Sequence, residues 1–349
     1  MQWDIFCRVI DNHGDLGVCW RLAADLASRG EAVRLWVDDP LALAWMAPHG
    51  ARGVSVIRWI DPLPAFAPGE VVIEAFGCDP PTAFVERMAA MATPPVWVNL
   101  EYLSAEAYVE RSHGLASPRI VGAGKGLTKW FFYPGFTSAT GGLLREARAL
   151  DAATPGWLAA QGVPVRAGER CVSLFAYADA PLEALFDRLD DQPTLVLLAA
   201  GAAQAPARTL FDAQGQRGRH LRAYALPWFD QAGYDRLLRV CDINFARGED
   251  SIVRAMWAGA PFVWQIYAQQ DGAHAAKLDA LLASLSAHAA PELAAQVAQL
   301  WRAWNGLGAW PDTLPEAANW RALCQRWRAR LAEQSDLTSQ LFGFAAAKR

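Results

Sequence analysis

Two aspartates and two glycines lie close together near the start of the chain, in the stretch DNHGDLG at residues 11–17. The stretch follows an apolar run at 5–10 and precedes a segment, 18–28, with the residue spacing of a helix. A glycine loop in this place often binds phosphate, but the G-x-G-x-x-G fingerprint is absent, since only Gly14 and Gly17 are present. Two interpretations are open: Asp15 caps the helix, or Asp11 and Asp15 supply a base or an orienting carboxylate at a strand end.

The densest group of polar residues lies in NFARGEDSIVRAMWAG at 244–259. The pattern predicts a strand end, a turn at Gly248 and a helix start, whose backbone N–H groups attract anions. Arg247 adds a positive charge and Ser251 a hydroxyl donor, while Glu249 and Asp250 can accept hydrogen bonds from ribose or sugar hydroxyls. Asp250 or Ser251 could instead only cap the helix, but one cap does not explain the whole group, so a nucleotide site is favoured.

Aromatic residues occur at two further element ends. SLFAY at 173–177 ends a predicted strand, and PWFDQAGY at 227–234 precedes a predicted helix; their rings could stack a nucleobase, although such residues more often belong to a core. GAGKGLT at 122–128 is not a phosphate loop, because Arg119 and Gly126 stand where that motif needs glycine and a hydroxyl residue. No histidine, cysteine or carboxylate group has metal-ligand spacing and D-x-D is absent, so no metal is expected.

Predicted strands and helices alternate along both halves of the chain, and these elements must position the polar and aromatic segments described above. Strands are expected at 3–9, 33–37, 54–57, 71–75, 96–100, 171–177, 195–199, 221–224, 243–245 and 262–266. Helices are expected at 17–30, 182–188, 234–240, 251–259 and 271–284, with a Pro- and Gly-containing linker at 147–168 and an amphipathic tail at 315–331. The alternation predicts two α/β domains with doubly wound parallel sheets, which bind ligands at the carboxyl ends of their strands.

The overall composition limits the classes of protein to which the chain can belong. With 349 residues, 53% of them hydrophobic, the chain is long enough for two domains with separate cores. A formal net charge of −4 argues against a broad nucleic-acid footprint, and no apolar run is long enough to span a membrane. The six cysteines are scattered and no secretory signal precedes the first strand, so we expect a cytoplasmic protein with reduced thiols.

Three stretches together, DNHGDLGVCWRLA at 11–23, SLFAY at 173–177 and FARGEDSIVRAMWAGAPFVWQIY at 245–267, resemble one family. It is the bacterial protein-arginine rhamnosyltransferases that modify translation elongation factor P, the EarP family. The resemblance implies a GT-B glycosyltransferase with two Rossmann-like domains facing each other across a cleft. Residues 1–150 would bind the acceptor and 165–315 the nucleotide sugar, followed by a helical segment, 316–349, that can pack back on the N-terminal domain.

The resemblance also implies the reaction and its residues. An inverting transfer would move L-rhamnose from dTDP-β-L-rhamnose to an arginine guanidine of elongation factor P, with no metal or other cofactor. Asp15 would be the base, Asp11 and Glu249 would support catalysis, and the donor would contact Asn12, Gly14, Phe175, Tyr177, Gln231, Tyr234, Arg247, Glu249, Asp250 and Ser251. Trp228 stands where phenylalanine is expected. The residues alone leave open a GT-B enzyme with another acceptor, a sugar-nucleotide epimerase, or a non-enzymatic binding module for a nucleotide sugar or a translation factor.

Overall fold

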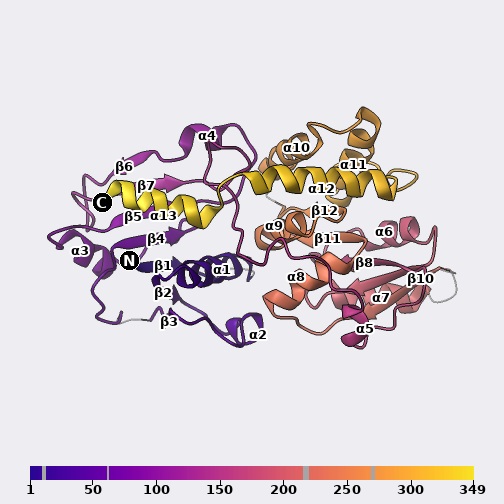
Figure 1. Cartoon of the computed structure of the whole chain (residues 1–349), viewed down its shortest axis with the longest axis horizontal. Helices are drawn as coiled ribbons and strands as arrows, with labels where there is room; N and C mark the ends of the chain where they lie inside the picture. The colour runs from indigo at the N-terminus through magenta and orange to yellow at the C-terminus, as the bar shows by residue number, and fades with distance from the viewer. Residues whose placement is uncertain (10–12, 61–62, 215–219, 269–271) are drawn as a thin grey trace. The chain divides into compact units, whose positions relative to one another are not determined.

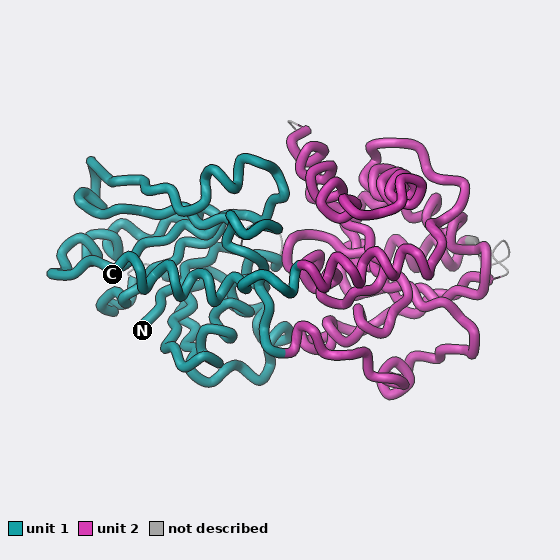
Figure 2. The backbone as a smooth tube through the Cα atoms, turned by 45° about the horizontal axis from the view of Figure 1, so that its top comes forward, with its two compact units in different colours: residues 1–147, 331–349 teal, residues 148–330 magenta. Residues whose placement is uncertain are grey.

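The computed structural model describes residues 1–9, 13–60, 63–214, 220–268 and 272–349. It contains two compact units, each described by itself below (Figure 2). Unit 1 comprises Met1–Ala147 together with Leu331–Arg349, and unit 2 comprises Arg148–Arg330. The last residues of the chain therefore return to the unit in which the chain begins.

Unit 1 contains a seven-stranded sheet in the order β3-β2-β1-β4-β5-β7-β6 (Figure 1). All neighbouring pairs are parallel except β6 with β7. The strand order reverses between β1 and β4, which makes the carboxyl ends of these two strands the topological switch point of the unit. The strands are β1 (Gln2–Cys7), β2 (Ala32–Val37), β3 (Val54–Arg58), β4 (Val71–Ala75), β5 (Val96–Leu100), β6 (Ala116–Pro118) and β7 (Thr128–Phe132).

Alternating side chains of the central strands bury both faces of this sheet. Trp3 and Ile5 of β1 belong to a core cluster with residues of α1 (Gly14–Ser28), α2 (Leu43–Met46) and α13 (Leu337–Lys348). Phe6, the next residue along, belongs to a cluster on the opposite face with residues of α3 (Thr82–Ala89). A further short helix of this unit is α4 (Tyr108–Ser112).

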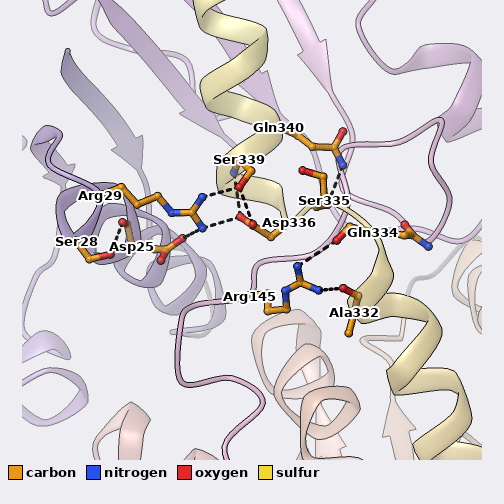
Figure 3. A network of polar contacts seen from close by, with 10 residues as sticks. All are labelled: Asp25, Ser28, Arg29, Arg145, Ala332, Gln334, Ser335, Asp336, Ser339 and Gln340. Atoms are coloured by element: carbon orange, nitrogen blue, oxygen red, sulfur yellow. Dashed lines mark hydrogen bonds and ion pairs between the residues drawn. The ribbon is translucent and has the colours of Figure 1, made fainter.

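A polar network holds the C-terminal helix α13 against α1 (Figure 3). The Arg29 guanidinium lies 2.7 Å from carboxylate oxygens of both Asp25 and Asp336 and also donates to Ser339 Oγ. Asp336 caps α13, because its Oδ1 accepts from the Ser339 N–H at 2.9 Å. Burial raises the pKa of Asp336, but the bonds from Ser339 and Arg29 outweigh it and hold that pKa below its usual value.

Unit 2 contains a five-stranded, all-parallel sheet in the order β10-β9-β8-β11-β12. Its switch point lies between β8 and β11, in the same relation to the strand order as in unit 1. The strands are β8 (Arg170–Leu174), β9 (Thr194–Leu198), β10 (Leu221–Ala225), β11 (Ile243–Arg247) and β12 (Phe262–Gln265). The helices are α5 (Trp157–Ala160), α6 (Leu182–Leu189), α7 (Gln204–Gln214), α8 (Gln231–Val240), α9 (Gly248–Ala258), α10 (Ala273–Ser286), α11 (Pro291–Trp304) and α12 (Ala317–Glu333), which ends in unit 1.

The unit boundaries differ from the predicted domains. The change of unit falls between Ala147 and Arg148, and the segment predicted as a linker belongs to unit 2. Trp157 and Val163 explain the error, because both are buried in the core cluster under α8. The segment 316–349 is divided between the units: α12 lies almost wholly in unit 2, while residues 331–349, with α13, belong to unit 1. Strands β6 and β7 were absent from the prediction.

Candidate active site

Asp15 is the second residue of α1 and does not cap that helix. The N-cap position is His13, and no side chain there bonds to the helix, so the capping interpretation is wrong. Instead, Asp15 Oδ2 accepts a hydrogen bond at 3.2 Å from the hydroxyl of Tyr102, which follows β5. Gly14 begins α1, and an added Cβ there would meet no atom within 4 Å. Asp11 and Asn12 lie outside the described residues.

An unusual backbone conformation lies beside this contact. Phe76, directly after β4, has a φ of +58° and is the sole non-glycine residue with positive φ in the described part of the chain. Such a conformation costs on the order of 1–3 kcal/mol and is often found at functional sites. The Phe76 ring stacks on Tyr102 with 4.6 Å between centroids and 20° between planes. The ends of β4 and β5 and the start of α1 thus bring a carboxylate and two aromatic rings together.

In unit 2, the predicted turn and helix start are present. Gly248 opens α9 with a φ of +67°, a conformation that glycine adopts without strain. The N-cap is Arg247, with no capping side chain, so the idea that Asp250 or Ser251 only caps the helix is wrong. N–H groups of the first turn of a helix have no partners within it, and the helix dipole is positive there. The start of α9 is therefore suited to an anion.

The predicted aromatic residues surround Arg247. Its guanidinium carbon lies 4.6 Å from the ring centroid of Phe175 and 4.6 Å from that of Tyr177. Both rings lie in the segment after β8, and Arg247 is the last residue of β11, so the two strands at the switch point bring the cation and the rings together. Burial lowers the pKa of Arg247, and Tyr177 and Tyr234 offset part of that change. A cation held in low-dielectric surroundings interacts strongly with an arriving phosphate.

Helix α8 adds the next predicted residues. Asp230 caps it by accepting from the Gly233 N–H at 2.6 Å, which places Gln231 in the first turn and Tyr234 three positions further on. The Tyr234 ring meets Phe175 edge-on at 5.7 Å. Burial raises the pKa of the Tyr234 phenol, and the neighbouring Ser251 hydroxyl offsets part of that rise.

Ion pairs hold Glu249 of α9 in place and attach this helix to α8. Lys277 Nζ of α10 lies 2.6 Å from Glu249 Oε1, with both side chains about four-fifths buried. Arg254, almost wholly buried, binds both carboxylate oxygens of Asp235 at 3.1 and 2.9 Å and so joins α9 to α8. Asp250 is half-buried in the first turn of α9. The Lys277 cation therefore offsets the negative charge of Glu249 at the start of α9.

Several residues at these switch points were not predicted. Tyr102 and Lys277 each come from a different element than the motif residue that they contact, and Phe76 contacts Tyr102. Gly201 follows β9 with a φ of +150°, and an added Cβ there would lie 3.1 Å from the Phe175 ring. Gln265 Oε1 accepts from the Tyr177 N–H at 2.8 Å and fixes the chain after β8. Of these residues, only Gly201 carries a signal in the sequence, because a positive φ favours glycine.

Comparison with known proteins identifies the class and then the family. The glycosyltransferase SnogD of Streptomyces nogalater, 15% identical, superposes with a TM-score of 0.55 over 99% of this chain and 100% of its own. Two doubly wound units and this likeness define the GT-B fold. A family model described as Elongation-Factor P (EF-P) rhamnosyltransferase EarP matches residues 3–346. The chain belongs to this family and is an enzyme.

Individual relatives agree over nearly the whole length. A protein-arginine rhamnosyltransferase of Pseudomonas aeruginosa is 42% identical, covering 99% of each chain, and one of Neisseria meningitidis is 31% identical, covering 98% of this chain and 96% of its own. A solved structure described as the structural basis for EarP-mediated arginine glycosylation of translation elongation factor EF-P has a TM-score of 0.67 at 32% identity, over 100% of this chain and 99% of that one. Within the described ranges, no helix is long and apolar enough to cross a membrane.

Proposed function

We propose that this enzyme transfers L-rhamnose from dTDP-β-L-rhamnose to one arginine guanidine of elongation factor P, with inversion at the anomeric carbon, in the cytoplasm. The relatives' names support the arginine acceptor and the rhamnosyl group. The observation that carries the proposal is the opposite chemistry of the two switch points. Unit 1 presents a carboxylate, Asp15, suited to a cationic acceptor, while unit 2 presents a helix start and Arg247, suited to an anionic donor.

The acceptor chemistry explains the need for a carboxylate. The pKa of a guanidinium lies far above cellular pH, so the neutral guanidine is very scarce near pH 7. An aspartate, with an ordinary pKa of about 3.9, cannot remove the proton in a separate earlier step. Asp15 therefore binds the guanidinium, polarises one N–H bond, and takes the proton as the nitrogen attacks carbon. Asp11 is proposed to assist as a second carboxylate in the same loop.

The donor chemistry assigns the leaving group to unit 2. The C–O bond from the anomeric carbon to the diphosphate breaks, and dTDP leaves with the electron pair. The N–H groups at the start of α9, the Ser251 hydroxyl and the Arg247 cation stabilise the negative charge that develops there. Glu249 and Asp250 bind ribose or sugar hydroxyls, and the rings of Phe175, Tyr177 and Tyr234 contact the nucleotide with Gln231. These groups supply the charge stabilisation without a metal, so activity is expected to persist in excess EDTA.

Inversion follows from a single displacement. The arginine nitrogen approaches one face of the sugar while the diphosphate leaves from the other, so the β-configured donor gives an α-configured product. One C–N bond forms, one C–O bond breaks, and one proton moves to Asp15. No glycosyl-enzyme intermediate is needed.

The substitution Asp15→Asn tests the division of roles. It is expected to abolish transfer to elongation factor P while the dTDP affinity measured by calorimetry stays within a few fold, because the donor is bound by the other unit. Asp79→Asn is a matched control, since Asp79 also belongs to unit 1, where it follows β4, but its side chain is 82% exposed. This control is expected to retain activity within about twofold. Loss of dTDP binding together with activity in the Asp15 variant would assign that residue to the donor site instead.

A further inference from the structure

Tyr102 contacts both Asp15 and Phe76 at the switch point of unit 1. Its hydroxyl donates to Asp15 Oδ2 at 3.2 Å, and its ring stacks on Phe76 at 4.6 Å. Tyr102 is nevertheless 40% exposed, so this ring is not simply a member of the core. A tyrosine that holds the carboxylate of a proposed base and also offers ring surface to solvent is placed to meet the acceptor.

The strained residue behind Tyr102 supports a role beyond packing. Phe76 adopts its positive φ directly after β4, and its N–H donates to the Leu100 carbonyl at 2.7 Å. That bond ties the strained turn to the end of β5, two residues before Tyr102. An unstrained turn would direct the Phe76 ring elsewhere and remove the support under Tyr102. The backbone conformation therefore serves to fix the plane of the Tyr102 ring.

A carboxylate beside an aromatic ring is a good fit for a guanidinium. The guanidinium group is planar, stacks on aromatic faces, and donates from its edge to carboxylates. Asp15 provides the acceptor oxygens and Tyr102 provides the ring, joined to each other by a hydrogen bond. An ammonium group can pair with the carboxylate but cannot stack in the same way, which favours arginine over lysine.

We infer that Tyr102 is an acceptor-side residue with two roles: its hydroxyl positions the Asp15 carboxylate, and its ring, backed by Phe76, binds the arginine guanidinium. The inference rests on the proposed function, because it assumes an arginine acceptor and Asp15 as base. It concerns unit 1 alone, so donor binding is expected to be independent of Tyr102.

Two substitutions separate the two roles. Tyr102→Phe removes the hydroxyl and keeps the ring, so kcat is expected to fall about tenfold while KM for elongation factor P changes less than threefold, since one hydrogen bond of ordinary strength is lost. Tyr102→Leu also removes the ring, so KM for the acceptor is expected to rise a further tenfold. The dTDP affinity is expected to stay within twofold of wild type in both variants. If Tyr102 had a purely structural role, the two variants would not affect kcat and KM separately.

Matched controls and contrary outcomes make the test decisive. Phe342→Leu removes another exposed ring of unit 1, from α13 and 42% exposed, and Tyr224→Phe removes a hydroxyl in unit 2; both are expected to retain wild-type kinetics. Wild-type kcat in Tyr102→Phe overturns the positioning role, even if the leucine variant fails to fold. If the wild-type enzyme modifies elongation factor P but both Tyr102 variants match it, only this inference fails. If the wild-type enzyme does not modify elongation factor P, the proposed function fails as well.

Discussion

Removing the charge of Arg247 is expected to weaken dTDP binding without disturbing the nucleoside. The guanidinium lies 4.6 Å from each of two ring centroids and is largely buried, which lowers its pKa and makes its charge costly to hold without an anion. The substitution Arg247→Met keeps an unbranched apolar stem between Phe175 and Tyr177 while it removes the charge. It therefore tests electrostatics with little change in packing.

The magnitude follows from one charge-assisted hydrogen bond to phosphate. Such bonds contribute about 1.5–3 kcal/mol, which corresponds to a Kd for dTDP roughly 10- to 100-fold higher. Thymidine lacks the diphosphate, so its affinity is expected to stay within about threefold. Arg247→Lys keeps a charge but loses the planar fork between the rings, and an intermediate Kd is expected.

Titration calorimetry of dTDP and thymidine with each variant measures these differences directly. Arg302→Met is the matched control: Arg302 pairs with Asp279 at 2.9 Å in the same unit, but both side chains are about half exposed. Such a pair contributes little, so this variant is expected to bind dTDP like wild type. Unchanged dTDP affinity in Arg247→Met, or an equal loss for thymidine, would refute the anion-site interpretation.

Three further predictions concern other parts of the chain. Gly14→Ala is expected to leave the free energy of unfolding unchanged or about 0.5–1 kcal/mol higher, since the position is helical and open. It is expected to reduce activity, because substrate is proposed to approach the backbone there. The control Gly343→Ala in α13, where an added Cβ is equally free of contacts, is expected to stay active. Lys277→Met is expected to reduce activity through Glu249, so that a double variant with Glu249→Gln loses less than the product of the single losses in kinetic assays. Asp336→Asn keeps a side chain that can cap α13 but removes the charge that pairs with Arg29, so it is expected to lower stability by about 0.5–1 kcal/mol. Because the folded pKa of Asp336 is depressed, this difference in urea unfolding is expected to persist above about pH 4 and to vanish as pH falls through the folded pKa.

The sheet frameworks were largely predictable, because buried parallel strands are continuous apolar runs. The predicted strands at 71–75 and 96–100 match β4 and β5 residue for residue, and both have all five side chains buried. Strand β7, with the sequence TKWFF, is not among the predicted strands; a proline and a glycine, which are typical of turns, follow it within two and three residues. The predicted linker was wrong because proline and glycine there surround a short helix whose Trp157 is buried.

The two motif-bearing sites were predictable only in part. Arg247, Gly248 and Phe175 carry local signals, a turn between strand and helix and rings at a strand end, and the structure brings them together. Tyr102 lies 87 positions along the chain from Asp15 and meets it only because β1, β4 and β5 are neighbours in the sheet. A single sequence contains no periodicity that reports such a contact, so the fold was needed to find it.

The central claim is tested most directly by mass spectrometry of elongation factor P incubated with this enzyme and dTDP-β-L-rhamnose. We expect a single deoxyhexose increment on the intact factor, placed on one arginine by tandem mass spectrometry, in the presence of EDTA. The increment is expected to be absent with the Asp15→Asn variant. An unmodified factor after incubation with active donor, or a sugar on a residue other than arginine, would contradict the account.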